Sequence, residues 1–347
     1  MRHKSLIEKD MYDLASNRKW PDLNGKKVLI TGGTGLIGIN FVNFFLSLNA
    51  NVSITIRQQC SIHEKIFPEL ENVNINVVDF KDDCFFECDE KYDYIIHAAG
   101  YSSPARFMEE QIQTIKIGYA TNDLLKLLKP DGKFLFISSS EVYSGLKRSK
   151  NGYEEGEIGC VPINHKRISY IETKKMGEII INLAREKGID AKSVRVSLVY
   201  GPGIRYNDKR VLHDLIQKAI TSKKIQLLDS GKSIRTYCYI NDGIEMMANV
   251  LFYGKKNVYN IGGISYTTIY DLALKIAEKI GDVKVIKGTY NNIGAPNFVM
   301  VNMLRYFEEF GNKSFVSLDD GLKNTIKWQK HFMDVISKTK GEPWDKI

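Results

Sequence analysis

The sequence predicts an α/β protein built on a doubly wound parallel sheet, with a smaller lobe formed by the C-terminal part of the chain. Three observations support this. Short apolar segments alternate with longer amphipathic segments from residue 27 to residue 198, a glycine-rich turn follows the first apolar segment, and the alternation becomes less regular after Tyr200-Gly201-Pro202-Gly203. Strands that alternate with helices are typical of parallel sheets covered on both faces.

Each apolar segment is short enough for one strand, and each amphipathic segment is long enough for one helix. Six segments are predicted to be strands of the main sheet: Lys27–Thr31, Val52–Ile56, Ile75–Val78, Tyr94–His97, Lys133–Ser138 and Ser193–Leu198. Leu36–Leu48 and Gln113–Leu128 are predicted helices, and Val258–Ile261 is predicted to return one strand to the sheet. In such sheets, ligands bind beyond the C-terminal ends of the strands.

Composition narrows the class of protein. The 347 residues carry a net charge of +8, but no tract of five basic residues occurs, which disfavours nucleic acid as a partner. No apolar run approaches the roughly 20 residues that span a membrane, and Met1-Arg2-His3-Lys4 leads into no apolar signal segment. The five cysteines are odd in number and scattered, and no metal-ligand spacing is present. We therefore expect a cytoplasmic protein with reduced thiols, no metal and no membrane partner.

The glycine-rich turn reads Thr31-Gly32-Gly33-Thr34-Gly35-Leu36-Ile37-Gly38. A strand, spaced glycines and a helix in this order form the turn that binds the pyrophosphate of a dinucleotide. Gly32 permits the tight turn, Gly35 lets the backbone approach the pyrophosphate, and Gly38 lets helix and strand pack closely. The helix N-terminus adds amide donors and partial positive charge. The whole turn, with Thr34, Leu36 and Ile37, is therefore a predicted nicotinamide-cofactor site.

Residues after the next three strands extend this predicted site. NAD-selective sites usually carry Asp or Glu after the second strand, where this chain has Arg57. An arginine suits the 2′-phosphate of NADP+, or it stacks on adenine and permits either cofactor, so NAD+ and NADP+ both remain open. Asp79 and Phe80 are candidates to pair with and flank the adenine, and Ala98-Ala99-Gly100 provides small side chains where the cofactor crosses the sheet.

A second motif carries acid–base chemistry. Tyr170 and Lys174 are spaced i, i+4 and therefore share one helix face. An ammonium close to a phenol favours the phenolate, so we expect Lys174 to lower the pKa of Tyr170. Ser139, after the fifth predicted strand, can hydrogen-bond the same substrate oxygen. Together they form a predicted general base for the hydroxyl group of a sugar or alcohol.

These motifs predict the division of the chain. Residues 1–24 form an N-terminal extension, and residues 25–198 form a dinucleotide-binding Rossmann domain with a returning segment near 236–263. Residues 199–347 mainly form the substrate-binding lobe.

The chain resembles the extended short-chain dehydrogenase/reductase family, specifically its nucleotide-sugar branch, over about residues 25–335. The matching motifs are TGGTGLIG, HAAG at 97–100, SSSEVYSG at 138–145, YIETK at 170–174 and YGP at 200–202. Within the branch it is most similar to UDP-glucuronate decarboxylases. That similarity rests on Ser102-Ser103-Pro104, on residues 167–174, and on Asp208-Lys209-Arg210-Val211 together with residues 230–235. The resemblance implies a tightly held cofactor that is reduced and reoxidised within one turnover, and a homodimer built on a helix bundle that includes the Tyr170 helix.

The resemblance also implies roles for individual residues. Tyr170 is the base with Lys174 as its partner, Ser139 lies beside the sugar 4-OH, and Glu141 is an acid/base near C5. Arg235 lies near the pyrophosphate or the sugar C6 group, and Arg210 contacts the nucleotide end. Further substrate contacts are implied for Ser102, Ser103, Ser140 and Arg167.

Three positions depart from the family pattern: Lys116 and Leu198 stand where asparagines are usual, and Ala295-Pro296-Asn297 lacks an expected arginine. The reaction therefore stays open between decarboxylation of UDP-glucuronate to UDP-xylose or its 4-keto intermediate, 4,6-dehydration and 4-epimerisation. Glu141 favours the first two, since an epimerase has little need for a carboxylate beside C5. A reductase that consumes free NADPH and a non-catalytic NADP-binding regulator are further alternatives.

Overall fold

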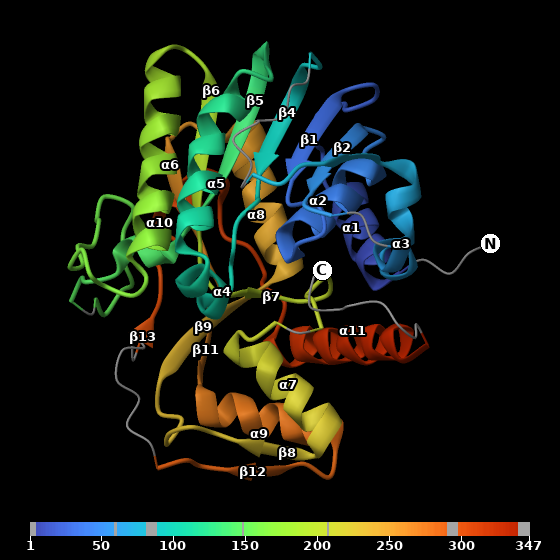
Figure 1. Ribbon diagram of the computed structural model, residues 1–347, viewed down its shortest axis with the longest axis vertical. Helices are drawn as coiled ribbons and strands as arrows, with labels where there is room; N and C mark the ends of the chain where they lie inside the picture. The colour runs from blue at the N-terminus through green and yellow to red at the C-terminus, as the bar shows by residue number, and fades with distance from the viewer. Residues whose placement is uncertain are drawn as a thin grey trace.

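The computed structural model describes residues 5–58, 61–80, 89–147, 149–206, 208–289 and 298–338. A sheet of seven parallel strands lies between two layers of helices, and a smaller lobe lies beyond the C-terminal ends of the strands (Figure 1). The predicted α/β class, with a Rossmann-type doubly wound sheet, is confirmed.

The strand order places a ligand crevice at the middle of the sheet. The order is β3-β2-β1-β4-β5-β6-β10, so the chain reverses direction across the sheet between β1 and β4. Such a switch point leaves a crevice beyond the C-terminal strand ends. The strands are β1 (Lys27–Thr31), β2 (Asn51–Ile56), β3 (Asn74–Val77), β4 (Tyr92–His97), β5 (Leu128–Ser139), β6 (Asp190–Val196) and β10 (Val258–Ile261).

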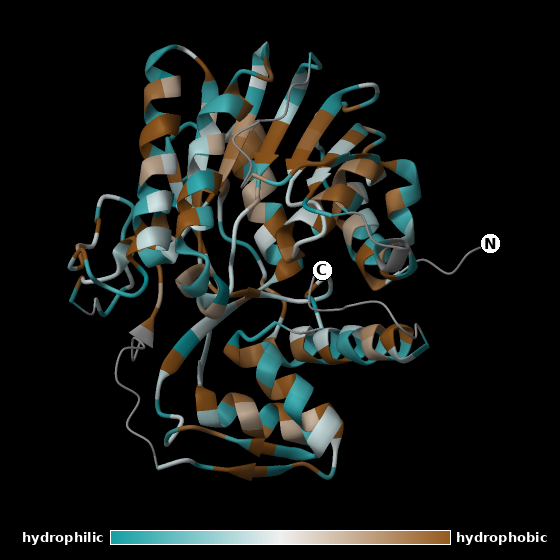
Figure 2. Cartoon of the chain, in the orientation of Figure 1, coloured by the Kyte–Doolittle hydropathy of each residue, from teal (hydrophilic) through white to brown (hydrophobic). Residues whose placement is uncertain are grey.

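Alternate residues of β1 face opposite helix layers, as the period of a strand requires. Val28 and Ile30 belong to the core that includes α1, α2 and α8, whereas Leu29 packs in the cluster with α5 and α6. The central strands are accordingly rich in hydrophobic residues (Figure 2). The helices are α1 (Leu6–Ser16), α2 (Leu36–Ser47), α8 (Ile240–Tyr253), α4 (Pro104–Glu109), α5 (Gln111–Leu125) and α6 (Ile168–Glu186).

The described part of the N-terminal segment forms α1, which packs against α2 and α8. Ser5 and Glu8 form a reciprocal capping box that satisfies amides at its first turn. Ile7 and Met11 are buried in the main core. Helix α1 is therefore integrated with the Rossmann layer.

The smaller lobe contains α7, α9 and α11 with short strands (Figure 1). Strand β9 pairs with β7, β11 and β13, and β8 pairs with β12. The elements are β7 (Val199–Tyr200), α7 (Val211–Ser222), β8 (Lys224–Gln226), β9 (Ile234–Tyr239), β11 (Ser265–Thr268), α9 (Ile269–Ile280), β12 (Lys284–Ile286), β13 (Phe298–Val299) and α11 (Leu318–Lys338). Shorter helices elsewhere are α3 (Ser61–Ile66), η1 (Pro68–Asn72), η2 (Ser140–Tyr143) and α10 (Leu304–Phe310).

Several predicted boundaries were wrong, among them the start of β5, which lies at Leu128 and not at Lys133. The helix expected to reach Leu128 ends at Leu125, because Leu128 already pairs with Tyr92 at the start of β5. The strand expected to reach Leu198 ends at Val196, because Leu198 has a positive φ of 39°, which interrupts the strand. Within the described ranges, no helix has the length and apolar character needed to cross a membrane.

Candidate functional site

The glycine-rich turn connects β1 to α2 with very little space between its parts. Gly32 has φ +69°, and a Cβ there would lie 3.0 Å from the backbone of Ala99. A Cβ on Gly38 would clash with the carbonyl oxygen of Gly32, so the first turn of α2 packs directly on the loop. Gly35 caps α2 without a side-chain hydrogen bond. This arrangement fits a dinucleotide, because helix amides remain available to phosphate where the backbone can be approached closely.

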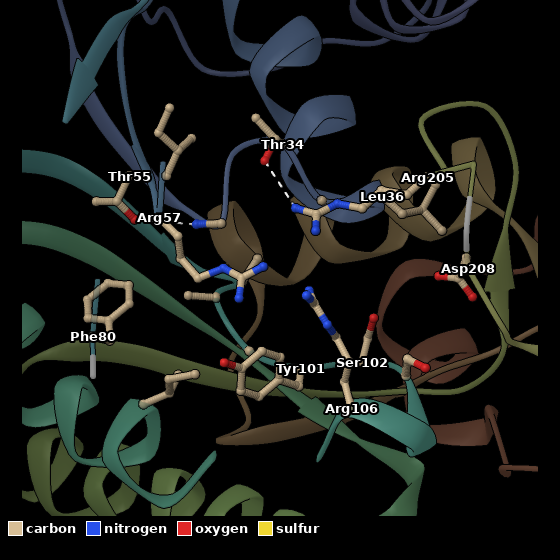
Figure 3. Close-up of a pocket in the computed structure, with 18 of the residues that line it drawn as sticks. Thr34, Leu36, Thr55, Arg57, Phe80, Tyr101, Ser102, Arg106, Arg205 and Asp208 are labelled. Carbon is tan, nitrogen blue, oxygen red and sulfur yellow. Dashed lines mark hydrogen bonds between the residues drawn. The ribbon is translucent and has the colours of Figure 1, made fainter. Parts of the chain in front are cut away.

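A cavity of about 450 Å³ opens beside this turn, at the C-terminal ends of the central strands (Figure 3). It brings together most of the predicted cofactor residues: Gly32, Thr34, Gly35, Leu36, Arg57, Asp79, Phe80, Ala98, Ala99 and Gly100. Ile37 and Gly38 are not in the lining, and Gly38 acts through the packing described above. Of the predicted substrate residues, Ser102, Ser103 and Arg210 line the same cavity.

Several further lining residues were not predicted as site residues, and those with polar or charged groups directed into the cavity include Tyr101, Arg106, Arg205 and Asp208 (Figure 3). Arg205 follows the YGPG turn, and its Nη2 donates to Thr34 Oγ1 at 3.3 Å (Figure 3). Arg106 is the second residue after the Ser102-Ser103-Pro104 motif. Its guanidinium lies 5.8 Å from the Tyr101 ring centroid. The only indication in the sequence that Arg106 and Arg205 belong to the site is that each lies next to a recognised motif. Nothing else in the sequence distinguishes them from surface arginines.

Tyr170 and Lys174 lie on α6 and line a small second cavity, which shares Ala99, Gly100 and Tyr101 with the larger one. Both residues are buried. Lys174 Nζ lies 5.7 Å from the Tyr170 ring centroid and donates to the Ile137 carbonyl oxygen at 2.8 Å. The two predicted acid–base residues are therefore next to each other and adjoin the predicted cofactor cavity.

The expected lowering of the Tyr170 pKa was wrong as a net direction. Burial raises the pKa of Tyr170 to about 12, and the charge of Glu141 raises it further. The hydrogen bond with Ser139 and the charges of Arg210 and Arg167 oppose this rise, but burial dominates because it disfavours the phenolate. Burial also lowers the pKa of Lys174 to about 8.

A buried network anchors α6 one turn beyond Lys174. Glu178 accepts from Arg195 Nη2 at 2.8 Å and from Ser138 Oγ at 2.6 Å. Arg195 also donates to Tyr143 Oη at 2.9 Å. This network ties α6 to β5 and β6, and the Glu178 carboxylate partly counteracts the lowered pKa of Lys174.

Glu141 lies in η2, where its backbone N–H donates to Ser139 Oγ at 3.2 Å. Its Oε1 forms an ion pair with Arg167 Nη1 at 2.5 Å, and its Oε2 accepts from Ser144 Oγ at 3.2 Å. Ser140 is the first residue of η2. The predicted C5 acid/base is thus held by an arginine, a pairing that the sequence pattern did not reveal.

Arg235 lies on β9 in the smaller lobe and interacts electrostatically with Glu141 and Arg167. Burial lowers its pKa, the nearby Arg167 adds to this, and the charges of Tyr237, Asp229 and Glu141 oppose it. Arg167, Arg235 and Glu141 thus interact electrostatically, and Glu141 is already engaged in an ion pair with Arg167. The positive charge of Arg235 therefore favours a substrate with its own anionic group.

Arg210 is held at the edge of the larger cavity. Its Nε donates to Asp208 Oδ1 and its Nη2 to Asp208 Oδ2, both at 3.0 Å. Its charge also reaches Tyr170, whose pKa it lowers. Arg210 therefore lies between the predicted cofactor cavity and the acid–base pair.

The positions that depart from the family pattern are only partly described. Lys116 lies in α5 next to Ile117, which lines both cavities. Leu198 has the positive φ noted above, a conformation that asparagine adopts more readily than leucine. Ala295-Pro296-Asn297 lies outside the described residues.

A Rossmann sheet with a glycine-rich cradle and an adjoining Ser–Tyr–Lys group defines a nucleotide-cofactor enzyme class. Residues 28–262 match the model of the NAD dependent epimerase/dehydratase family, and the chain belongs to this family. It is an NAD(P)-dependent nucleotide-sugar enzyme of the extended short-chain dehydrogenase/reductase type.

Individual relatives are distant. UDP-glucuronic acid decarboxylase 1 of Arabidopsis thaliana is 25% identical over 309 residues, which cover 86% of this chain and 69% of the relative. dTDP-4-dehydro-6-deoxy-D-allose reductase of Streptomyces bikiniensis is 25% identical over 320 residues, 88% of this chain and 97% of the relative. The structure of the epimerase Mth375 of Methanothermobacter thermautotrophicus has a TM-score of 0.78 at 20% identity, covering 96% and 98% of the two chains.

Proposed function

We propose that this enzyme oxidises C4 of a nucleotide-bound sugar and decarboxylates UDP-glucuronate to UDP-xylose or its 4-keto intermediate. The observation that carries the proposal is the ion pair of Arg167 with Glu141 beside Tyr170 and Ser139, with the Arg235 guanidinium close enough to interact electrostatically with both charged groups. Arg235 forms no ion pair among the described residues, and its Nη1 donates only to the Ile234 carbonyl oxygen, so its guanidinium can pair with a substrate carboxylate. The relatedness to UDP-glucuronic acid decarboxylases supports the same choice.

In this proposal, each residue has a role that follows from its position. Tyr170 takes the proton of the sugar 4-OH, and Ser139 hydrogen-bonds the same oxygen. The positive charges of Arg167 and Arg210 help Tyr170 to lose its proton, and the Lys174 ammonium adjoins its ring. When bound, the nicotinamide cofactor takes up and returns the C4 hydride.

The C4 ketone makes loss of the C6 carboxylate possible. The C5–C6 bond breaks, its electron pair enters the enolate of the C4 ketone, and CO2 leaves. Arg235 orients the carboxylate before it departs. A proton then adds to C5, and Glu141 is the candidate acid nearest this group. Dehydration of a hexose would instead need Glu141 to accept the C5 proton, and its ion pair with Arg167, which holds the carboxylate in its charged form, is compatible with that role.

The test is mass spectrometry of UDP-glucuronate after incubation with the purified enzyme and NAD+ or NADP+ in D2O. We expect loss of CO2 and one deuterium at C5, with no net reduction of the cofactor if UDP-xylose is released and one equivalent of reduced cofactor if the 4-keto product is released. Tyr170→Phe is the inactive control. An unchanged mass with a new sugar stereoisomer by NMR would identify an epimerase, and loss of water from UDP-, dTDP-, CDP- or GDP-hexoses a dehydratase. Net consumption of NADPH with a 4-ketosugar would identify a reductase, the activity in the name of the Streptomyces relative. Binding of the cofactor without turnover of any nucleotide sugar would support the alternative of a non-catalytic NADP-binding regulator.

We further propose that residues 25–198, with the segment near 236–263, bind the cofactor and that residues 199–347 mainly bind the nucleotide sugar. A homodimer through α5 and α6 completes the proposal. These two helices pack side by side and expose apolar side chains at Ile112, Tyr119, Ile179 and Leu183. A contiguous apolar face of this kind marks a protein–protein contact.

A further inference from the structure

Three arginines from distant parts of the chain converge on the larger cavity. Arg57 follows β2, Arg106 lies in α4, and Arg205 lies in the loop after β7. Figure 3 shows the side chains of all three directed toward the same space. The guanidinium groups of Arg57 and Arg106 lie 5.4 Å and 5.8 Å, respectively, from the centroid of the Tyr101 ring.

This convergence carries an electrostatic cost. Burial, together with the charges of Arg57 and Arg106, lowers the pKa of Arg205 to about 10. Asp208 partly offsets this, yet Asp208 is already engaged by Arg210 through two parallel hydrogen bonds. Clustered guanidinium groups in a concave site are stabilised by an anion that accepts hydrogen bonds from them.

An independent observation in the same cavity points to a ligand. The ring of Tyr101 is 6% exposed, and its hydroxyl has no hydrogen-bond partner among the described residues. A buried hydroxyl without a partner is costly, so a bound polar group that reaches it would remove that cost. Tyr101 lines both cavities and therefore lies between the arginines and Tyr170.

We propose that Arg57 and Arg205 bind the 2′-phosphate of the adenosine ribose, so that this enzyme uses NADP in preference to NAD. The inference rests on the proposed function only in placing a nicotinamide dinucleotide in the cavity. The residue after the second strand reaches this ribose, and an acidic residue there accepts from the 2′-hydroxyl of NAD. Arg57 lacks that acceptor and instead offers a planar donor fork suited to phosphate. Arg57 and Arg205 line the same cavity, and Figure 3 shows both side chains directed into it, so they can approach the same anion.

The test compares ligands that differ only in this phosphate, using the full-length protein freed of bound nucleotide and isothermal titration calorimetry. We expect wild-type protein to bind NADP+ about 10- to 100-fold more tightly than NAD+, the range expected for one or two hydrogen bonds to a charged group. The same preference should appear for 2′,5′-ADP over ADP and should weaken with added salt. Lys150 is an exposed lysine outside the cavity lining, and Lys150→Ala should keep the preference.

Two variants make the result decisive. Arg57→Ala should bring the Kd values for NADP+ and NAD+ within about threefold of each other by weakening only the former, and Arg57→Asp should reverse the order. Equal wild-type affinities for 2′,5′-ADP and ADP would overturn the proposal. So would an Arg57→Ala variant that weakens both dinucleotides equally, because Arg57 would then contact the adenine or the pyrophosphate. These titrations contain no nucleotide sugar, so their outcome is independent of whether UDP-glucuronate is decarboxylated.

Discussion

Lys174 and Tyr170 are both buried, and burial opposes the charged form of each side chain. It holds the pKa of Lys174 at about 8 and raises that of Tyr170 to about 12. The i, i+4 spacing predicted that the two side chains share a face, and the structure confirms it. The direction of the Tyr170 pKa could not be predicted, because burial depends on Tyr101, Phe107 and Ile117, which pack around its ring from other elements.

The first prediction concerns pH. Lys174 is protonated below its folded pKa of about 8, and its ammonium favours the Tyr170 phenolate that accepts the sugar proton. Tyr170, with its raised pKa, loses its proton more readily as the pH rises, so turnover should first increase with pH and then level off or fall above about 8, well below the ordinary lysine value of about 10.4. The measurement is kcat/KM against pH with saturating cofactor. A profile that keeps increasing up to pH 10 would show that the charge on Lys174 does not support turnover.

The second prediction concerns Glu141. Glu141→Gln retains a side chain that can accept from Arg167 but cannot transfer a proton at C5. We expect turnover to fall by about 100-fold or more, the usual contribution of a general acid or base, while cofactor affinity is unchanged. Glu154 is an exposed glutamate, and Glu154→Gln is the matched control. Near-wild-type turnover of Glu141→Gln on the true substrate would remove Glu141 from the mechanism.

At the scale of elements, the join between β1 and α2 forms the cofactor cradle. The sequence pattern predicted the strand, the turn and the helix with correct order and nearly correct ends. It also predicted that Gly38 permits close packing, which the clash of an added Cβ with Gly32 bears out. Such local features are readable because a turn and the start of a helix depend on adjacent residues.

The third prediction tests this packing. Gly38→Ala should destabilise the protein by about 1–3 kcal/mol, because the new methyl group overlaps a backbone oxygen that cannot move independently. It should also weaken ADP binding, since the turn must shift. Gly156 has open space around its Cβ position, so Gly156→Ala should change stability by no more than about 0.5 kcal/mol. Thermal denaturation with and without ADP measures both effects, and equal stability of the two variants would contradict the packing argument.

At the scale of the whole molecule, the site is assembled where the smaller lobe meets the sheet. Arg235 comes from β9, Arg210 precedes α7, and Glu141 follows β5. The exposed apolar side chains are carried by α5 and α6, which lie next to each other on one face of the sheet (Figure 1). A dimer through this face would brace α6, the helix that carries Tyr170 and Lys174.

The fourth prediction tests that dimer. Tyr119 and Ile179 are 60% and 56% exposed, and glutamates at both positions would place charge in the proposed interface. The double variant Tyr119→Glu/Ile179→Glu should be monomeric by size-exclusion chromatography with light scattering, whereas wild-type protein is dimeric. Leu274, 42% exposed on α9, is the control, and Leu274→Glu should remain dimeric. A monomeric wild-type protein at micromolar concentration would refute the proposed assembly.

The sequence by itself determined the fold class, the glycine-rich turn and the spacing of Tyr170 and Lys174, because each depends on residues close together in the chain. The tertiary structure decided which distant residues share a site. It brought Arg106 and Arg205 to Arg57, paired Glu141 with Arg167, and placed Arg235 beside them. No local sequence pattern predicts that these residues lie close together, because their positions depend on how the strand ends, the loops and the smaller lobe are arranged beyond the sheet. The pKa directions belong to the same category, because burial and charge are properties of the assembled molecule.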